Sequence, residues 1–141
     1  MRQIQTPAYS KSDKLALSGS ATSSVDRIDY PIFCFRHLHD DYGVDQCIAG
    51  DGQFIRQLFK KIQRVSGLSW TDIQFANRKG NGTEKIAKSS IKKSIPISIT
   101  EDVKDFLSFY FNGTKGRMIG FRNKMIFHIV YIDTKLDVYR H

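Results

Sequence analysis

Three apolar runs separated by short turns decide the fold, and they lie in residues 106–133, FLSFYFNGTKGRMIGFRNKMIFHIVYID. The turns NGTKG and RNK are short enough to join antiparallel neighbours. Strict alternation along the last run places Phe127 and Tyr131 on one face and His128 and Val130 on the other. Because both faces of this run are largely apolar, we expect a central strand that helices cover on one side.

Upstream of these strands, the sequence predicts one strand and two helices. Residues 30–38 are aromatic and β-branched with a proline near the start, which favours a first strand. Residues 53–66, QFIRQLFKKIQRVS, repeat apolar side chains at helical spacing and predict an amphipathic helix. Ser69, followed three residues later by Asp72, is typical of the start of a second, short helix.

The remaining segments give weaker signals. Residues 81–94 are rich in Lys and Ser and predict an ordered loop. Residues 95–99 are extended in character but contain a proline, so they form at most an edge segment. The last segment, LDVYRH (136–141), is a candidate fourth strand of the C-terminal sheet.

The predicted fold class is α+β with the order β-α-α-β-β-β, an antiparallel sheet with two helices packed on one face. Residues 1–28 are rich in Ser, Thr and Ala, which indicates a flexible N-terminal arm. Residues 29–141 then form a single domain, as expected for a chain of 141 residues.

The composition restricts the class of protein. Hydrophobic residues make up 40% of the chain and charged residues 26%, which is typical of a globular fold. No apolar run approaches the ~20 residues that cross a bilayer, so no membrane segment is predicted. Two cysteines are too few for a disulfide framework. We therefore expect a cytoplasmic protein.

The positive charge is concentrated in the middle of the chain. The net charge is +8 overall, with −1 in residues 1–50, +7 in 51–99 and +2 in 100–141. Clustered cations fit a polyanion partner, such as a nucleic acid or an acidic protein, and they fit a solubilising surface equally well. The candidate nucleic-acid-binding residues are Arg56, Lys60, Lys61, Arg64, Arg78, Lys79, Lys85, Lys92 and Lys93.

The element order and residues 116–141, GRMIGFRNKMIFHIVYIDTKLDVYRH, resemble the RelE/ParE-like bacterial toxins, which include ribosome-dependent messenger-RNA endonucleases. The same stretch resembles the C-terminus of small bacterial and phage-type proteins. The toxin resemblance implies RNA or the ribosome as target, an antitoxin as partner, and Tyr139 and His141 at the positions used for cleavage. Two features depart from the family: the long N-terminal arm, and the absence of a match for its carboxylate, since neither Glu84 nor Glu101 lies in a recognisable motif.

Metal-independent cleavage of a phosphodiester needs an acid, a base and cations for the developing charge. His141 or His128 would act as acid or base, because imidazole titrates near neutral pH. Tyr139 would orient the phosphate, and the guanidinium groups of Arg117 and Arg122 would bind its oxygens. The alternatives are a frayed tail for His141 and a buried, hydrogen-bonded core histidine for His128.

No metal site or cofactor is predicted. Cys34 and His37 would point to opposite faces of a strand, and the addition of His39, Asp40 or Cys47 matches no zinc module. The mixture of glycines and cations in NRKGNGTEK, residues 77–85, is neither a P-loop nor a dinucleotide fingerprint. A basic loop that touches a polyanion, or a plain exposed turn, fits this segment.

The sequence thus supports several functional hypotheses. The first is a toxin-like, RNA-targeting protein, with metal-independent endoribonuclease activity in a toxin–antitoxin system. The second is a non-enzymatic module that binds nucleic acid or an acidic protein, and the third is a phage-type inhibitor. The first hypothesis requires the basic middle segment and the C-terminal Tyr139 and His141 to lie on one surface.

Overall fold

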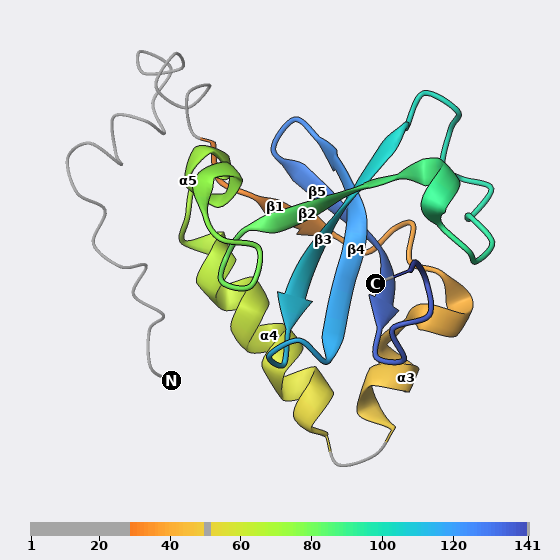
Figure 1. Ribbon diagram of the computed structural model, residues 1–141, viewed down its shortest axis with the longest axis horizontal. Coiled ribbons are helices and arrows are strands. Elements are labelled where there is room, and N and C mark those ends of the chain that lie inside the picture. Colours follow the sequence, from red (N-terminus) through yellow and green to blue (C-terminus); the bar gives the residue numbers. More distant parts are fainter. Residues whose placement is uncertain (1–28, 50–51, 141) are drawn as a thin grey trace, which may run out of the picture.

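The computed structural model describes residues 29–49 and 52–140 (Figure 1). The predicted arm, residues 1–28, and the candidate catalytic His141 lie outside the described residues. In chain order the elements are β1 (Ile32–Cys34), the 3-10 helix η2 (Asp40–Tyr42), α3 (Val44–Ile48), α4 (Gln53–Ser66), α5 (Trp70–Phe75), β2 (Thr83–Ala87), the 3-10 helix η3 (Lys88–Ser90), β3 (Asp105–Phe111), β4 (Gly116–Asn123) and β5 (Ile126–Asp133).

Five strands form one sheet in the order β1-β5-β4-β3-β2. The pairs β2–β3, β3–β4 and β4–β5 are antiparallel, whereas β1 runs parallel to β5. The predicted α+β class is confirmed, but the expectation of a wholly antiparallel sheet is wrong at this one pair. Parallel neighbours need a long crossover connection, and here all the other elements stand between β1 and β5.

The helices cover one face of the sheet, as predicted. Leu58 and Val65 of α4 and Trp70 and Ile73 of α5 are buried in a cluster with Phe109 of β3 and other apolar side chains of the strands. Figure 1 shows α4 running alongside the sheet, with α5 following it. Cys47 of α3, which the sequence did not predict as a helix, joins the same cluster.

Irregular chain covers the opposite face, which we call the loop face. Ile95 and Ile99 of the segment after η3, and Val138 of the C-terminal segment, pack against Phe106 and Tyr131. Residues 95–99 and 136–140 contain no strand. Their apolar side chains lie against the sheet and bury its second face, so the expectation that they add strands is wrong.

The segment predicted as a loop contains a strand. Residues 83–87 form β2, an edge strand whose partner is β3, with Ile86 buried opposite Phe106. Exposed lysines such as Lys85 are common on edge strands because they discourage pairing with other chains. The lysines that made this segment resemble a loop are therefore compatible with an edge strand.

A bulge in β5 changes which side chains share a face. Ile119 is opposite Tyr131, whereas Gly120 is opposite Ile129, so Val130 is an extra residue in β5. Tyr131 consequently lies on the loop face together with Val130, and the predicted alternation is wrong from this point on. The chain approaches Gly120 so closely that a Cβ there would collide with the carbonyl group of His128.

Candidate nucleic-acid interface

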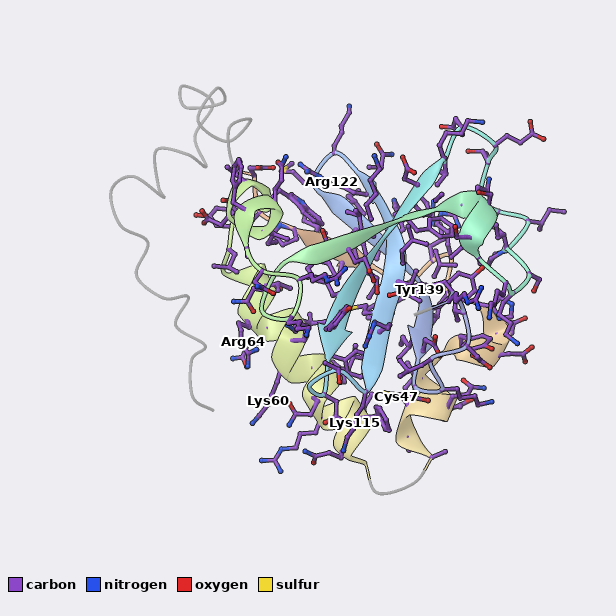
Figure 2. The ribbon with its side chains drawn as sticks, viewed as in Figure 1. Cys47, Lys60, Arg64, Lys115, Arg122 and Tyr139 are labelled. Carbon is purple, nitrogen blue, oxygen red and sulfur yellow. The ribbon has the colours of Figure 1, made fainter. Side chains whose placement is uncertain are left out.

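The exposed side of α4 carries three basic side chains in successive turns. Arg56, Lys60 and Arg64 recur every four residues, a spacing that aligns them along a helix, and all three are exposed. Figure 2 shows Lys60 and Arg64 on the side of α4 that faces away from the sheet. Among residues 29–49 and 52–140, none of these three cations forms an ion pair with a carboxylate.

An exposed aromatic ring lies beside these cations. Phe59 of α4 is 62% exposed, although it is one of the apolar residues that repeat at helical spacing in residues 53–66. Its position is about 100° around the helix from the buried Leu58, which turns it away from the sheet. Phe75, at the end of α5, is 82% exposed. A helical projection centred on Leu58 and Val65 would have revealed the exposure of Phe59.

A tight turn at residues 77–82 approaches α4. The backbone N–H groups of Gly80 and Gly82 both donate to the carbonyl oxygen of Asn77, at 2.8 and 2.9 Å. Gly82 has no substitute here, because a Cβ would collide with the backbone of Ala76. The Nζ group of Lys61 donates to the carbonyl oxygen of Gly80 at 2.5 Å. The turn therefore holds Lys79 next to the helix.

A cavity of about 170 Å³ opens between α4, this turn and the end of β3. Lys61, Arg64 and Lys79 line it, and none of the described residues that line it is acidic. Lys61 is only 6% exposed. Burial lowers the pKa of Lys61 to about 8, and the positive charge of Arg64 contributes to the same effect. We call this site the cationic cavity.

The other predicted cations have different surroundings. Lys92 is exposed on the loop-face side, where its backbone N–H donates to the carbonyl oxygen of Val138. The remaining three form ion pairs, which are Arg78–Glu84 at 2.9 Å, Lys85–Asp105 at 3.4 Å and Lys93–Asp137 at 3.6 Å. The nine candidate binding residues therefore do not form one continuous surface.

Tyr139, a candidate catalytic residue, lies inside the fold. It is 4% exposed, and its phenol hydrogen-bonds with Oε1 of Glu84 at 2.8 Å and with Oγ of Ser108 at 3.1 Å. Burial raises the pKa of Tyr139 to about 12, and Glu84 adds to the rise. No role for Glu84 was predicted, because a sequence motif does not reveal the β2–β3 register that places it opposite Ser108.

Arg117 is also buried, at 5% exposed. Its guanidinium stacks 3.6 Å from the ring centroid of Tyr110, and Nη1 donates to the carbonyl oxygens of Thr114 and Gly116 at 2.6 and 3.1 Å. It also lies close enough to Tyr139 to oppose the rise in the pKa of that phenol. The structure thus brings Arg117 and Tyr139 together, but in a buried network that joins a turn and the C-terminal segment.

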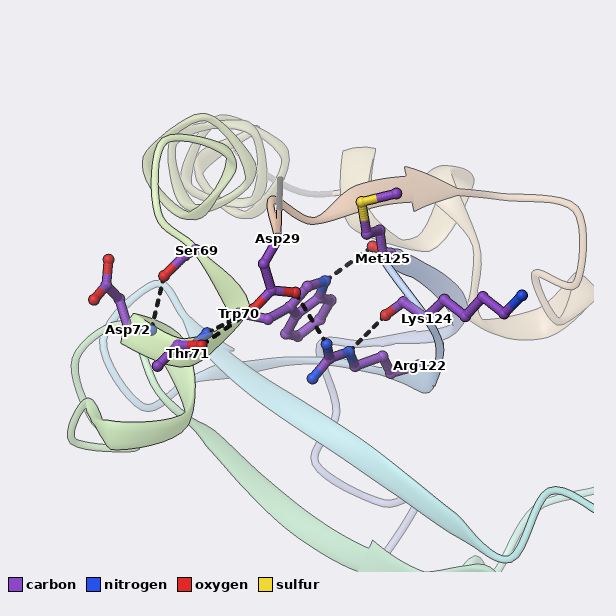
Figure 3. Close-up of polar contacts among 8 residues, drawn as sticks. All are labelled: Asp29, Ser69, Trp70, Thr71, Asp72, Arg122, Lys124 and Met125. Atoms are coloured by element: carbon purple, nitrogen blue, oxygen red, sulfur yellow. Dashed lines mark hydrogen bonds and ion pairs between the residues drawn. The ribbon is translucent and has the colours of Figure 1, made fainter. Parts of the chain in front are cut away.

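Arg122 lies near the other end of β4, in a different network (Figure 3). It forms an ion pair with Asp29 at 3.2 Å, covers the ring of Trp70 at 4.4 Å, and donates from Nε to the carbonyl oxygen of Lys124 at 2.6 Å. Five residues along a strand separate it from Arg117, or roughly 17 Å. The two guanidinium groups therefore do not clamp one phosphate, as the cleavage hypothesis expected.

Figure 3 also shows how the second helix starts. The backbone N–H of Asp72 donates to Oγ of Ser69 at 3.0 Å, which confirms the predicted N-cap. The indole N–H of Trp70 donates to the carbonyl oxygen of Met125 at 2.9 Å. Trp70 is therefore a core residue with a satisfied polar group, and its ring is covered by Arg122.

His128 is half-buried on the loop face. Its ring stacks on Phe121 with centroids 4.7 Å apart and contacts the ring of His37 edge-on at 5.1 Å. Its Nδ1 is buried with no hydrogen-bond partner in the described part of the chain, which differs from the hydrogen-bonded core histidine considered above. Burial, followed by the charges of His37 and Arg36, lowers the pKa of His128.

His128 and Arg122 line the same cavity, of about 620 Å³. Asp102 and Asp105 also line it, so its charge is mixed. Arg117 and Tyr139 lie elsewhere on the loop face, and the cations of α4 belong to the helix face. The described candidates therefore occupy separate places, and they do not form the single catalytic surface that the first hypothesis required.

Cys34 and Cys47 are free thiols. Within residues 29–49 and 52–140, no three His, Cys, Asp or Glu side chains are grouped so that they would hold a metal ion. None of the helices in these ranges has the length and apolar character needed to cross a membrane.

Comparisons of the chain with protein-family models, with curated proteins and with solved structures found no match. Function is therefore inferred from the charge, exposure and arrangement of the side chains themselves.

Proposed function

We propose that the protein binds single-stranded RNA through the outer side of α4 and the adjoining turn. We define this α4 surface as Arg56, Phe59, Lys60, Arg64 and Lys79. The observation that carries the proposal is the combination of unpaired cations with an exposed aromatic ring. Single-stranded nucleic acids are bound by this combination, because cations follow the phosphates while bases stack on the rings.

Electrostatics supports a polyanion as the ligand. Each phosphate neutralised by a Lys or Arg releases condensed counterions, so unpaired cations contribute more to binding than cations already paired with a carboxylate. Arg56, Lys60 and Arg64 are exposed and have no carboxylate partner among the described residues. An array repeated along one side of a helix fits the regular spacing of phosphates.

The exposed aromatic rings favour a single strand over a duplex. Phe59 is 62% and Phe75 82% exposed, so both rings are accessible for stacking on a base. RNA loops and ends offer unstacked bases for such rings, whereas a duplex keeps its bases stacked. An acidic protein partner would use the cations but has no comparable need for the rings.

The proposal covers binding and leaves out bond cleavage. Tyr139 and Arg117 are buried and hydrogen-bonded within the fold, and His128 lies in another cavity. The geometry of the described residues therefore supports an RNA-binding module better than an endoribonuclease.

A pair of double variants with equal changes of charge tests the proposal. The double variant Lys60→Glu, Arg64→Glu alters the α4 surface, and Lys92→Glu, Lys93→Glu is its matched control near the loop face. With a fluorescently labelled 12-nucleotide RNA, we expect anisotropy to show at least about tenfold weaker binding for the first variant and less than about twofold for the second. Equal losses in both would mean that only net charge matters, and would contradict the proposal.

A further inference from the structure

We propose that the cationic cavity binds the terminal phosphate of the RNA chain. This inference rests on the proposed function and specifies which group at the end of the RNA is recognised. The cavity combines Lys61 and Arg64 of α4 with Lys79 of the turn, and its lining within residues 29–49 and 52–140 contains no carboxylate. It lies next to the α4 surface and shares Arg64 and Lys79 with it, so one strand would occupy both.

The charge of the cavity matches a phosphomonoester better than an internal phosphodiester. A terminal phosphate carries about −1.5 to −2 at pH 7 and offers three strong acceptor oxygens. An internal phosphodiester carries a single negative charge. Three converging cations without an acidic neighbour are therefore neutralised more completely by an end group than by a link within the chain.

The size of the cavity also favours a terminal phosphate as its ligand. Its volume of about 170 Å³ corresponds to roughly six water molecules at about 30 Å³ each. Pockets for drug-sized ligands span about 300–1,000 Å³, so this one suits a small group rather than a base and its sugar. Because α4, the turn and the end of β3 enclose it on three sides, a group at a chain end enters more readily than one continued in both directions.

The burial of Lys61 gives an energetic reason for an anion to bind in the cavity. Lys61 as a whole is 6% exposed, and its ammonium group donates a hydrogen bond to the uncharged carbonyl oxygen of Gly80. A buried cation without an anionic partner is costly, and an anion in the cavity offsets that cost. Arg64 of α4, Lys79 of the turn and Tyr110 of β3 line the same cavity.

Binding of the end group should depend on pH through Lys61. Burial lowers the pKa of Lys61 to about 8 in the empty cavity, and a bound dianion favours the protonated form. The second pKa of a phosphomonoester is about 6, so the ligand stays dianionic above pH 7. The preference for a terminal phosphate should therefore decrease between pH 7 and pH 9 as free Lys61 loses its proton.

The test compares three RNA 12-mers of one sequence, with a 5′-phosphate, with a 3′-phosphate, or with hydroxyl groups at both ends. By anisotropy at pH 7, we expect one phosphorylated RNA to bind at least about fivefold more tightly than the hydroxyl RNA, which also identifies the end. Lys61→Met should reduce this preference to less than twofold. Lys61→Arg should retain the preference and keep it at pH 9.

The possible failures are distinguishable. If the wild-type protein binds all three RNAs equally, the inference about the end group is wrong and the proposed RNA binding stands. If it binds none of them, both are wrong. If Lys61→Met keeps the full preference, the end group is recognised elsewhere and the assignment to this cavity is wrong.

Discussion

Two groups of basic side chains come from the same stretch of the sequence but have different surroundings in the fold. The cations of α4, such as Lys60 and Arg64, have no carboxylate partner among the described residues, whereas Lys85 and Lys93 are each within ion-pairing distance of an aspartate. From the pattern of charges alone, all of them were equal candidates for binding a polyanion. The fold separates them. Helix α4 packs on one face of the sheet, whereas Lys93 lies between Ile91 and Ile95, which pack on the other face.

The comparison teaches that the count of cations overstates the available binding surface. An exposed ion pair contributes about 0–1 kcal/mol to stability, so the paired lysines gain little from their aspartates. They do lose part of their attraction for a distant polyanion. The unpaired cations keep theirs, and the buried one, Lys61, carries a cost in the absence of ligand.

The largest effect on stability should come from removing the buried positive charge of Lys61. Lys61→Met replaces a buried charge by an apolar side chain of similar length, and we expect a gain of ~1–3 kcal/mol in the free energy of unfolding at pH 7. Chemical denaturation measures it. Because the folded pKa of Lys61, about 8, lies below the unfolded value of 10.5, the wild type gains stability as pH rises between them. The advantage of the variant should therefore shrink from pH 8 to pH 10.

Lys60→Met is the matched control, since Lys60 is exposed and its removal should change stability by less than about 0.5 kcal/mol. A loss of stability in Lys61→Met at pH 7 would mean that the hydrogen bond to Gly80 outweighs the burial of the charge. The contrast between the two groups of cations would then be much weaker than described.

A smaller effect, on RNA affinity, should follow from removing the carboxylates that pair with lysines. Asp105→Asn and Asp137→Asn together remove the carboxylates that pair with Lys85 and Lys93. We expect RNA affinity, measured by anisotropy at about 0.15 M salt, to rise less than threefold, because the freed charges lie outside the α4 surface. A rise of tenfold or more would show that RNA is bound wherever positive charge is available.

Most of the fold was predictable because its signals are local. The β3–β4–β5 meander and the helices of residues 53–66 and 70–75 follow from periodicity, short turns and the Ser69 cap. The parallel partner of β1, the edge strand β2 and the bulge at Val130 were not predicted. Each depends on pairing between distant residues or on close packing, such as that at Gly120, which one-dimensional patterns do not encode.

Less of the candidate site was predictable. Charge clustering singled out Arg56, Lys60 and Arg64, which are exposed in the structure, but it also included Lys85 and Lys93, whose ion-pair partners are remote in sequence. Alternation cannot reveal that Tyr139 is buried, because its contact with Glu84 depends on the register of β2. The cationic cavity was missed for the same reason, since the turn that holds Lys79 meets α4 only in three dimensions.

The most direct test is to map where RNA binds on the protein by nitrogen–proton NMR spectroscopy of the backbone amides during titration with a single-stranded 12-mer. The account predicts that the largest chemical-shift changes occur in residues 56–64 of α4 and 77–82 of the turn. It predicts no comparable changes in residues 88–104. Shifts concentrated in residues 88–104, or around the cavity of His37 and His128, would contradict it.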